Sequence, residues 1–389
     1  MTTTINNEHK KLNVPNLRFK EFQGEWEKCR LGDVCTFLSG GTPKIDVKEY
    51  WNGTIPFVSA ISMHDTYILD SKLHISEEGL KHGSRLLTKN NLLLLVRGSM
   101  LWNSIPICLN KNDVAFNQDV KGIIANDTIN NEFLLYWLKS KEQRLKYMVT
   151  GTGLGAGKLD TSDLLSMIVY IPAMKEQDKV ARLLSLFDER IATQNKIIED
   201  LKKLKSAISK KLFCNDKWTT YIIQDIAEIG RGRVISSAEI DRQKRPLYPV
   251  YSSQTSNDGI MGYLDEYMFD GEYITWTTDG ANAGTVFYRK GMFNCTNVCG
   301  TLKILPKFDC YFVSLVLQQA TQKYVSSNLA NPKLMNNTMA SIKIKMPDIE
   351  TQKQLSKIFQ TLDSCLLAHQ RTCCMYSREK QYLLCQMFI

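Results

Sequence analysis

The chain alternates between two patterns of hydrophobic and polar positions, and each pattern occurs twice. From Trp26 onwards, short apolar runs are separated by Gly, Pro, Asn and Ser, which is typical of short strands and turns. After Pro172, apolar residues instead recur at intervals of four and three, which predicts one long helix packed along a seam. Both patterns begin again at Trp218, so we expect two strand-rich domains, each followed by a long helix.

The two predicted helices cover residues 174–214 and 348–389, and each is ~60 Å long at ~1.5 Å per residue. One apolar stripe alone would fit an amphipathic surface helix, whereas two stripes in register favour an intramolecular coiled coil. Two polar seam residues, Gln194 and His369, either pair and fix the register or lie at the solvent edge. The predicted seam residues are Val180, Leu184, Phe187, Ile191, Gln194, Ile198 and Leu201 in the first helix and Leu355, Phe359, Leu362, Leu366, His369, Cys373 and Tyr376 in the second.

An internal repeat supports this organisation. At a shift of 192 residues Trp26 matches Trp218 and Gly40 matches Gly232, and near the ends of the two copies the shift becomes 175. There the matching pairs are Lys158 and Lys333, Gln177 and Gln352, Asp188 and Asp363, and Lys205 and Lys380. A period this long indicates two homologous domains, not a solenoid. Because the shift changes inside the second domain, the differences are concentrated in the globular segments, where different recognition would be built.

The predicted fold class is α+β, with two homologous mixed, strand-rich domains separated by two long helices in a pseudo-two-fold internal repeat. The expected segments are a flexible tail at 1–17, a first domain at 18–173, a first spacer helix at 174–214, a second domain at 215–347 and a second spacer helix at 348–389.

Composition narrows the class of protein. The longest aliphatic run, Leu92–Val96, is too short to cross a bilayer, and the first residues contain no apolar segment, so we expect a cytoplasmic protein without a membrane partner. The 11 cysteines are then free thiols. The net charge of +9 permits a polyanion partner. Since residues 20–173 carry equal numbers of acidic and basic side chains, DNA affinity would have to come from local patches.

The sequence contains no complete motif for catalysis or for cofactor binding. The segment GTGLGAGK (151–158) lacks the first glycine and the Ser/Thr of a nucleotide-binding loop, and the second copy lacks its glycines. Asn331-Pro332 is only a partial echo of the Asn-Pro-Pro-aromatic site of amino-methyltransferases. Neither Cys295 with Cys299 nor Cys373 with Cys374 has the further ligands of a metal site. We therefore expect no catalytic residue, metal or cofactor on this chain.

Three segments carry a family resemblance: WEKCRLGDVCTFLSGGTP at the start of the first domain, IPAMKEQDKVARLLSLFDERI at the first helix and MPDIETQKQLSKIFQTLDSCL at the second. They resemble the specificity subunit of type I restriction–modification systems, over about residues 15–389. The shared pattern is a Pro, a Gln five residues later, and then spaced hydrophobic residues. It departs in the second copy, which has Thr351 where the first has Glu176, and in the cysteine-rich second helix.

The resemblance implies two target recognition domains that each read half of a split double-stranded DNA site, with two antiparallel helices as a ruler. It also implies docking of two modification subunits, which bring S-adenosylmethionine, and of restriction subunits, which use ATP and Mg²⁺, while this subunit has no catalysis of its own. Three alternatives stay open. They are the specificity subunit of a related type II system, a degenerate DNA adenine methyltransferase, and a coiled-coil interaction protein without a DNA function.

Polar residues in Gly/Ser-rich loops are the candidate DNA contacts, because Arg can bond guanine and Asn or Gln can bond adenine with two hydrogen bonds. The alternative for each is an exposed or structural loop residue, and for Lys158 and Lys333 a solvated turn in place of a phosphate contact. Arg231 and Arg233 are the leading candidates. The full set is Thr42, Lys44, Arg97, Asn103 and Lys158 in the first domain and Arg231, Arg233, Gln254, Asn257, Thr278, Asn282 and Lys333 in the second.

Overall fold

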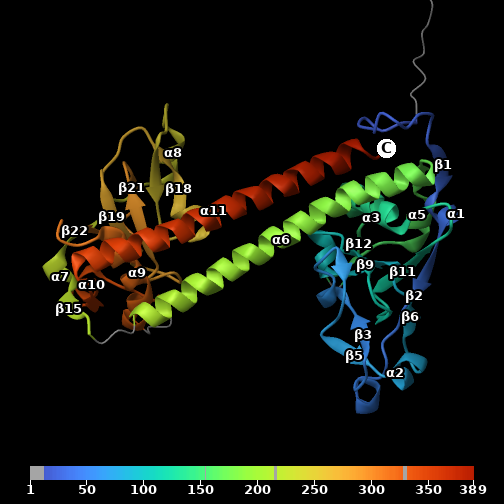
Figure 1. Cartoon of the computed structure of the whole chain (residues 1–389), viewed down its shortest axis with the longest axis horizontal. Coiled ribbons are helices and arrows are strands. Elements are labelled where there is room, and N and C mark those ends of the chain that lie inside the picture. Colours follow the sequence, from blue (N-terminus) through green and yellow to red (C-terminus); the bar gives the residue numbers. More distant parts are fainter. Residues whose placement is uncertain (1–12, 154, 214–216, 327–330) are drawn as a thin grey trace, which may run out of the picture. The chain divides into compact units, whose positions relative to one another are not determined.

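The computed structural model describes residues 13–153, 155–213, 217–326 and 331–389, which divide into two compact units (Figure 1). The first unit ends at Lys196 and also includes Gln370–Ile389, and the second is Ile197–His369. Residues 1–12 of the expected tail, the expected domain boundary at 214–215 and residues 154 and 327–330 of the two matching loops lie outside the described residues.

Short strands dominate the first unit, as the apolar runs predicted. Its strands are β1 (Glu27–Arg30), β2 (Cys35–Ser39), β3 (Ile55–Val58), β4 (Tyr67–Ile68), β5 (Leu73–Ile75), β6 (Arg85–Leu87), β7 (Leu92–Leu95), β8 (Arg97–Gly98), β9 (Ile107–Asn110), β10 (Val114–Phe116), β11 (Val120–Ala125), β12 (Thr150–Gly151), β13 (Gly157–Lys158) and β14 (Ile168–Ile171). Its helices are α1 (Leu31–Val34), η1 (Lys48–Tyr50), η2 (Ala60–Ser62), α2 (Glu77–Lys81), η3 (Ser99–Trp102), α3 (Asn131–Ser140), α4 (Glu142–Tyr147), α5 (Thr161–Ser166) and the first part of α6 (Met174–Phe213).

The core of the first unit lies between a mixed sheet in the order β2-β11-β7-β9-β4 and helix α3. Every side chain of β7 is buried, which explains why its sequence is a continuous leucine run. The beginning of α6 and the end of α11 (Ile349–Gln386) complete this core, through Leu184 and Leu384 among others. The long helices are therefore part of the domain core and not a detached stalk.

The second unit repeats this plan with fewer strands. Its strands are β15 (Thr219–Ile222), β16 (Ala227–Arg231), β17 (Tyr248–Tyr251), β18 (Ile260–Leu264), β19 (Glu272–Thr277), β20 (Val286–Lys290), β21 (Asn294–Cys295), β22 (Cys299–Ile304) and β23 (Lys343–Met346). Its helices are α7 (Ile223–Ile226), α8 (Ser237–Asp241), η4 (Ser256–Gly259), α9 (Cys310–Ala320), η5 (Thr321–Tyr324), α10 (Asn336–Ala340), the last part of α6 and the first part of α11.

Matching strands pair in the same way in both units. The order β16-β22-β19-β20 corresponds to β2-β11-β7-β9, and the entry and exit strands pair as β15 with β23 and as β1 with β14. In each unit a tryptophan packs edge-on against the phenylalanine of the covering helix, with ring centroids 5.9 Å apart: Trp26 with Phe133, and Trp218 with Phe312. The repeat and the predicted mixed α+β fold class are thus confirmed at the level of topology.

Both units also contain an antiparallel pair of long-helix segments. In the first unit Asp188 contacts Lys380 and Asn195 contacts Cys373, so the numbers fall along α11 as they rise along α6. In the second unit Lys205 contacts Asp363. All the predicted seam residues are buried or half-buried, as the heptad spacing requires. Whether Gln194 and His369 pair with each other stays a prediction, because they belong to different units.

The segment NEFLLYWLKSKEQRLKYM (131–148) has the apolar spacing of one helix but is divided in the structure. Residues 131–148 form two helices, α3 and α4, that meet at Lys141. There the backbone leaves helical geometry, with ψ at 11°, while the Lys141 side chain donates a hydrogen bond to the carbonyl of Ile389. This contact joins α3 to the end of α11, a long-range constraint that local periodicity does not contain.

Candidate nucleic-acid interface

In the first unit, the predicted contact residues lie at one end of the central sheet. Strands β2 and β7 end there, at Ser39 and Leu95, and their antiparallel neighbours β11 and β9 begin there. We call the loops that leave this end, residues 40–47, 96–106, 117–119, 150–153 and 155–158, the first loop face. It carries Thr42, Lys44, Arg97, Asn103 and Lys158, of which all but the half-buried Lys158 are exposed.

Hydrogen bonds connect the loops of this face to one another. Thr42 Oγ1 donates to Gln118 Oε1 at 2.7 Å, and Trp102 Nε1 donates to the carbonyl of Gly155 at 3.0 Å. Lys158 forms an ion pair with Asp160 at 3.2 Å, and the pKa of that carboxyl is lowered to about 2 by hydrogen bonds from Ser162 and then by Lys158. The loops are thus held against each other before any ligand binds, which favours specific recognition.

Arg97 differs from these neighbours. Its backbone lies in β8, directly opposite Lys158 in β13, and its amide donates to the carbonyl of Asp119 at 3.2 Å. Its side chain is exposed, and its guanidinium makes no hydrogen bond or ion pair with a residue that the structure describes. All its donors are therefore available to a ligand.

The second unit presents matching loops at the matching end of its sheet. We call residues 232–235, 252–259, 278–285, 296–298 and 331–334, together with Arg231, the second loop face. It is organised by Asp279, whose Oδ2 accepts from Arg231 Nη2 at 3.2 Å and from Thr278 Oγ1 at 2.6 Å. Lys333 Nζ lies 3.7 Å from the other carboxylate oxygen. Three predicted contact residues therefore lie around the carboxylate of Asp279: Arg231, Thr278 and Lys333. Asp279 itself was not among the predicted contacts.

This geometry corrects two expectations. Thr278 is 0% exposed, so its hydroxyl orients Asp279 and Arg231 and cannot contact a base directly. Arg231 also donates from Nε to the carbonyl of Asn297, and Arg233 forms an ion pair with Glu239. The two leading candidates are already engaged within the protein, whereas no described residue binds the guanidinium of Arg97.

The remaining candidates of the second loop face belong to a tightly fixed turn. Gln254 Nε2 donates to the carbonyl of Ile260, and Asn282 Nδ2 donates to that of Ser253 at 3.0 Å. Asn257 and Asp258 both have positive φ, 49° and 53°, a conformation that is uncommon outside glycine. Arg289, which is 4% exposed, holds this turn through Asp258 at 3.0 Å.

Arg289 is a functional candidate that the sequence reasoning missed. Its guanidinium stacks on the ring of Tyr251, 3.6 Å from the centroid, while its Nη2 donates to the carbonyl of Asp258. A lone arginine in the strand VFYRK gives no local sign of this role. Asp279 lies beside Thr278 and before a glycine, a loop position that could have marked it as a candidate contact. Its correspondence to Arg97 in the repeat is not visible in the sequence, because the repeat shift changes between the two copies.

Each domain is joined to both long helices by a Tyr–Asp–Lys network. In the first unit, Tyr136 of α3 donates to Asp188 of α6 at 2.8 Å, and Lys380 of α11 donates to the other oxygen at 2.5 Å. In the second, Tyr311 of α9, Asp363 of α11 and Lys205 of α6 repeat this arrangement. Burial and the neighbouring carboxylate raise the pKa of both tyrosines, so each remains a hydrogen-bond donor.

The conserved spacing between Pro and Gln in the repeat also has a structural cause. Gln177 is 1% exposed, donates to the carbonyl of Pro172 at 2.9 Å and accepts from the amide of Asn130, the N-cap of α3. Gln352 makes the same two contacts, with Pro347 and Asp309. The glutamine therefore fixes the end of the last strand to the start of the domain's main helix.

The departure from this pattern has an equally local explanation. Glu176 is 2% exposed and pairs with Arg18 at 2.7 Å, next to the indole of Trp26. Thr351 instead hydrogen-bonds Asp348 near the start of α11. In the first copy Glu176 thus binds the segment before β1, whereas in the second copy Thr351 forms a hydrogen bond near the start of α11.

A comparison with known protein families shows to which family this chain belongs. The type I restriction modification DNA specificity domain matches residues 23–203 and again 215–372. The chain belongs to this family. As a type I specificity subunit it has a non-catalytic role in a restriction–modification complex, and its two matches coincide with the two copies of the repeat.

Named relatives agree with this assignment. The specificity subunit is 43% identical to that of the Mycoplasma pneumoniae MpnII enzyme over 152 residues, which is 39% of this chain and 46% of the relative. It is 31% identical to the EcoR124I/EcoR124II specificity subunit of Escherichia coli over 174 residues, or 44% of this chain and 43% of that one. A crystal structure of a Mycoplasma genitalium S subunit has a TM-score of 0.71 at 19% identity, covering 97% of this chain and 99% of that one, and shows the shared fold.

Other kinds of site find little support in the specificity subunit. Across the described ranges, no three His, Cys, Asp or Glu side chains are grouped to hold a metal ion. Burial raises the pKa of Cys299 to about 11 and also raises that of Cys295, which disfavours the thiolate that a metal needs. Within the same described residues, no helix has both the length and the hydrophobicity of a membrane span.

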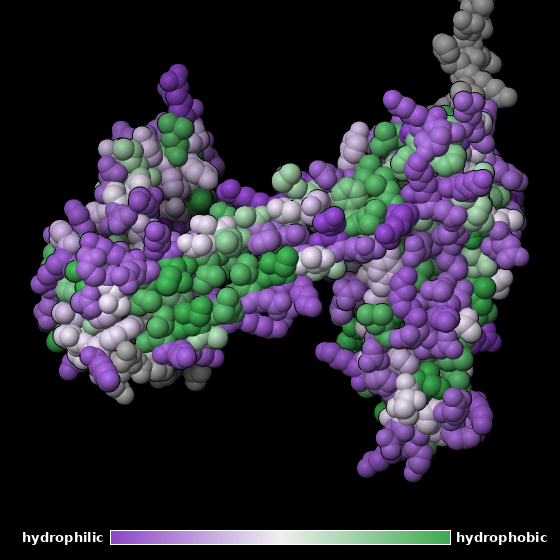
Figure 2. All heavy atoms as spheres, viewed as in Figure 1, coloured by the Kyte–Doolittle hydropathy of each residue, from purple (hydrophilic) through white to green (hydrophobic). Residues whose placement is uncertain are grey.

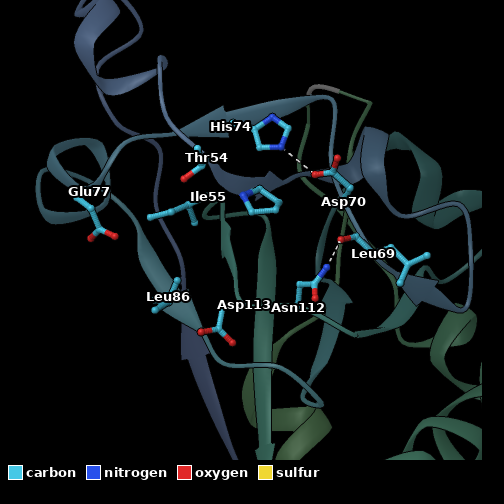
Figure 3. A pocket seen from close by; sticks show the side chains of 10 residues that line it. Thr54, Ile55, Leu69, Asp70, His74, Glu77, Leu86, Asn112 and Asp113 are labelled. Carbon is cyan, nitrogen blue, oxygen red and sulfur yellow. Dashed lines mark hydrogen bonds and ion pairs between the residues drawn. The ribbon is translucent and has the colours of Figure 1, made fainter.

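A pocket of about 630 Å³ in the specificity subunit lies away from the first loop face (Figure 3). It is lined by Thr54–Pro56 at the start of β3 and by Asp113 before β10, whereas residues 117–119 of the loop face follow the other end of β10. In the close-up, His74 pairs with Asp70 at 2.8 Å and Asn112 Nδ2 donates to the carbonyl of Leu69 at 2.7 Å. The pocket contains none of the predicted contact residues.

A half-buried lysine of the specificity subunit predicts a pH-dependent stability. Lys139 Nζ donates to Thr66 Oγ1 at 2.7 Å, and burial, followed by the charge of Lys380, lowers its pKa to about 8 from 10.5. Between these two values the unfolded chain binds the proton that folded Lys139 has lost, so the free energy of unfolding should rise with pH. Lys139→Met should be more stabilising at pH 7 than at pH 9.5, as measured by urea denaturation of the full chain. The same difference between variant and wild type at both pH values would contradict this.

Proposed function

We propose that the specificity subunit binds a split double-stranded DNA site, with each loop face reading one half. The observation that carries this proposal is the repetition of one scaffold with different side chains. Both loop faces follow the same end of the same sheet, yet one presents Arg97 and Lys158 and the other a carboxylate held by Arg231 and Lys333. A common scaffold with different polar groups is what two readers of different sequences need.

The long helices would set the gap between the half-sites. Helix α6 has 40 residues and α11 has 38, which corresponds to ~60 Å each at ~1.5 Å per residue. Neighbouring major-groove sites on one face of B-DNA recur about every 34 Å. Because each domain core includes segments of both helices, each reader would be fixed to the spacer and not tethered by a flexible linker.

The exposed sides of the helices are proposed to dock partner subunits. Figure 2 shows hydrophobic residues gathered over the long helices in the second unit, where Leu204, Ile358 and Leu367 are 48%, 50% and 47% exposed. Exposed apolar area of this kind is typical of protein interfaces. We propose that two methyltransferase subunits, which bind S-adenosylmethionine, dock on the helices, and that restriction subunits using ATP and Mg²⁺ join them. One relative in structure, with a TM-score of 0.53 at 14% identity, comes from work on the complex assembly of a type I system.

Two other assignments can be distinguished from this one by experiment. In a related type II system, one partner chain would carry both methylation and cleavage. A degenerate adenine methyltransferase would itself bind S-adenosylmethionine, so crosslinking of the labelled compound to the isolated chain separates it from a specificity subunit, for which we expect no labelling.

The deciding experiment is a methylome. The chain is expressed with the methyltransferase subunit encoded beside it in a host without other DNA methylation, and modified adenines are mapped by long-read sequencing. We expect one split motif with a fixed gap that disappears when this chain is omitted. Methylation at a continuous site would contradict the two-reader proposal, and an assembled complex without methylation would contradict a functional specificity subunit.

A further inference from the structure

Arg97 and Asp279 occupy equivalent positions on the two loop faces, and the first offers hydrogen-bond donors where the second offers an acceptor. We infer that Arg97 selects guanine in the half-site read by the first domain, and that Asp279 selects a base with an exocyclic amine, cytosine or adenine, in the other half-site. This inference rests on the proposed function and adds to it the class of base read at one position of each half-site.

The equivalence of Arg97 and Asp279 follows from backbone pairing. Each is the second residue after the matching strand, β7 or β19. Arg97 pairs antiparallel with Lys158, and Asp279 forms the corresponding bridge to Lys333, the matching lysine of the repeat. The next amide along, of Leu159 or Leu334, donates to the residue before each, Val96 or Thr278, at 2.8 and 2.9 Å.

The residue that follows is also the same in both copies. Gly98 and Gly280 both have positive φ, 149° and 92°, so the chain turns away at the same point after Arg97 and Asp279. A change at this position therefore alters the presented side chain while the backbone around it stays the same.

In the first domain this position offers only donors. Arg97 is exposed and unpaired among the described residues, and its neighbour Lys158 is paired with Asp160. The N7 and O6 acceptors of guanine in the major groove match the two parallel N–H groups of a guanidinium. No other base offers this pair of acceptors at the groove edge, so a free guanidinium here selects guanine.

In the second domain this position offers an acceptor. The Asp279 side chain is 23% exposed, and its Oδ2 is occupied by Arg231 and Thr278. Among the described residues, the one ion pair of its Oδ1 is with Lys333 at 3.7 Å, which leaves acceptor capacity for the amine of cytosine or adenine. Arg231 is a positioning residue here, because its donors are used to hold the carboxylate and the carbonyl of Asn297.

The test is the methylome of the assembled complex with single variants. Arg97→Ala should make one guanine position of one half-site degenerate, with at least a roughly 10-fold loss of discrimination, and should leave the other half-site and the gap unchanged. Asp279→Asn keeps the size and the acceptor oxygen that Arg231 and Thr278 need, but introduces a donor. It should change one position of the other half-site from cytosine or adenine towards guanine or thymine, which present carbonyl acceptors in the major groove. Lys158→Ala is the matched control, for which a phosphate contact predicts a uniform loss over all sites.

Each result has a distinct meaning. A wild-type motif without a guanine in the half-site affected by Arg97→Ala, a uniform loss for Arg97→Ala, or both variants altering the same half-site would overturn the inference while the proposed function stands. A wild-type complex that yields no split motif would overturn the proposed function itself. Size-exclusion chromatography of each complex excludes misfolding as the cause, because a variant that fails to assemble loses all methylation and not one base position.

Discussion

Gly40→Ala and Gly232→Ala are each expected to destabilise their domain by about 3 kcal/mol or more, since inserted atoms in a packed interior force backbone shifts. A Cβ on Gly40 would lie 2.2 Å from the carbonyl oxygen of Phe116, and one on Gly232 would lie 2.1 Å from that of Cys295. Both obstacles are backbone atoms, which cannot rotate away as a side chain can. The two glycines match in the repeat, so the same close approach is built twice.

Thermal and urea unfolding of the full chain would measure this effect. Gly151→Ala is the matched control, because its nearest obstacle is the ring of Trp102 at 3.9 Å, and it should change stability by less than about 0.5 kcal/mol. Equal stability of Gly40→Ala and Gly151→Ala would contradict the argument. The close approach matters for function because it places the start of each loop face against another segment of the same face, through the hydrogen bonds from Gly41 to Phe116 at the end of β10 and from Gly232 to Cys299 at the start of β22.

Asp188→Asn is expected to cost about 3 kcal/mol, whereas Asp363→Asn should cost about 1 kcal/mol or less. Asp188 and Lys380 are only 14% and 12% exposed, so the amide would leave an ammonium poorly solvated and without its counter-charge. Asp363 and Lys205 are 40% and 26% exposed, and water replaces more of the lost interaction. The two networks contain the same residue types, Tyr, Asp and Lys, and differ in how deeply they are buried. The costs of the two substitutions can therefore be compared directly.

A double-mutant cycle with Lys380→Met isolates this pair. The cost of Asp188→Asn should be much smaller in the Lys380→Met background, because no unpaired ammonium then remains. Equal costs in both backgrounds would show that Asp188 acts mainly through Tyr136. Hydrogen exchange of α3 should report the same loss locally, since Tyr136 would lose its acceptor.

Much of the architecture could be predicted from local patterns. The heptad spacing located the long helices, and the matched tryptophans, glutamines and lysines located the two copies, because such features depend on residues near one another in sequence. The candidate loops were also found, since Gly/Ser-rich segments between apolar runs leave the ends of strands. Local periodicity did not show the division of residues 131–148 into two helices at Lys141, whose side chain contacts Ile389, far along the chain.

Which loop residues are free to bind could not be predicted in the same way. Arg231 and Arg233 were the leading candidates from the sequence, ahead of Arg97, yet Asp279 and Glu239 engage them and no described residue engages Arg97. Thr278 looked like an exposed loop residue and is fully buried. Arg289, inside a strand, gave no loop signal at all and nevertheless holds the turn at Asn257 and Asp258.

The sequence by itself determined the duplication, the two long seams, the α+β class and the family, because apolar periodicity and repeated residues are properties of the chain written in order. Only the tertiary structure decided that Arg97 and Asp279 occupy one equivalent position, that no described residue pairs with Arg97, and that Arg231 holds Asp279. The physical reason is that ion pairing and burial depend on neighbours brought together across strands. A side chain's availability to DNA is set by those neighbours and not by its own type.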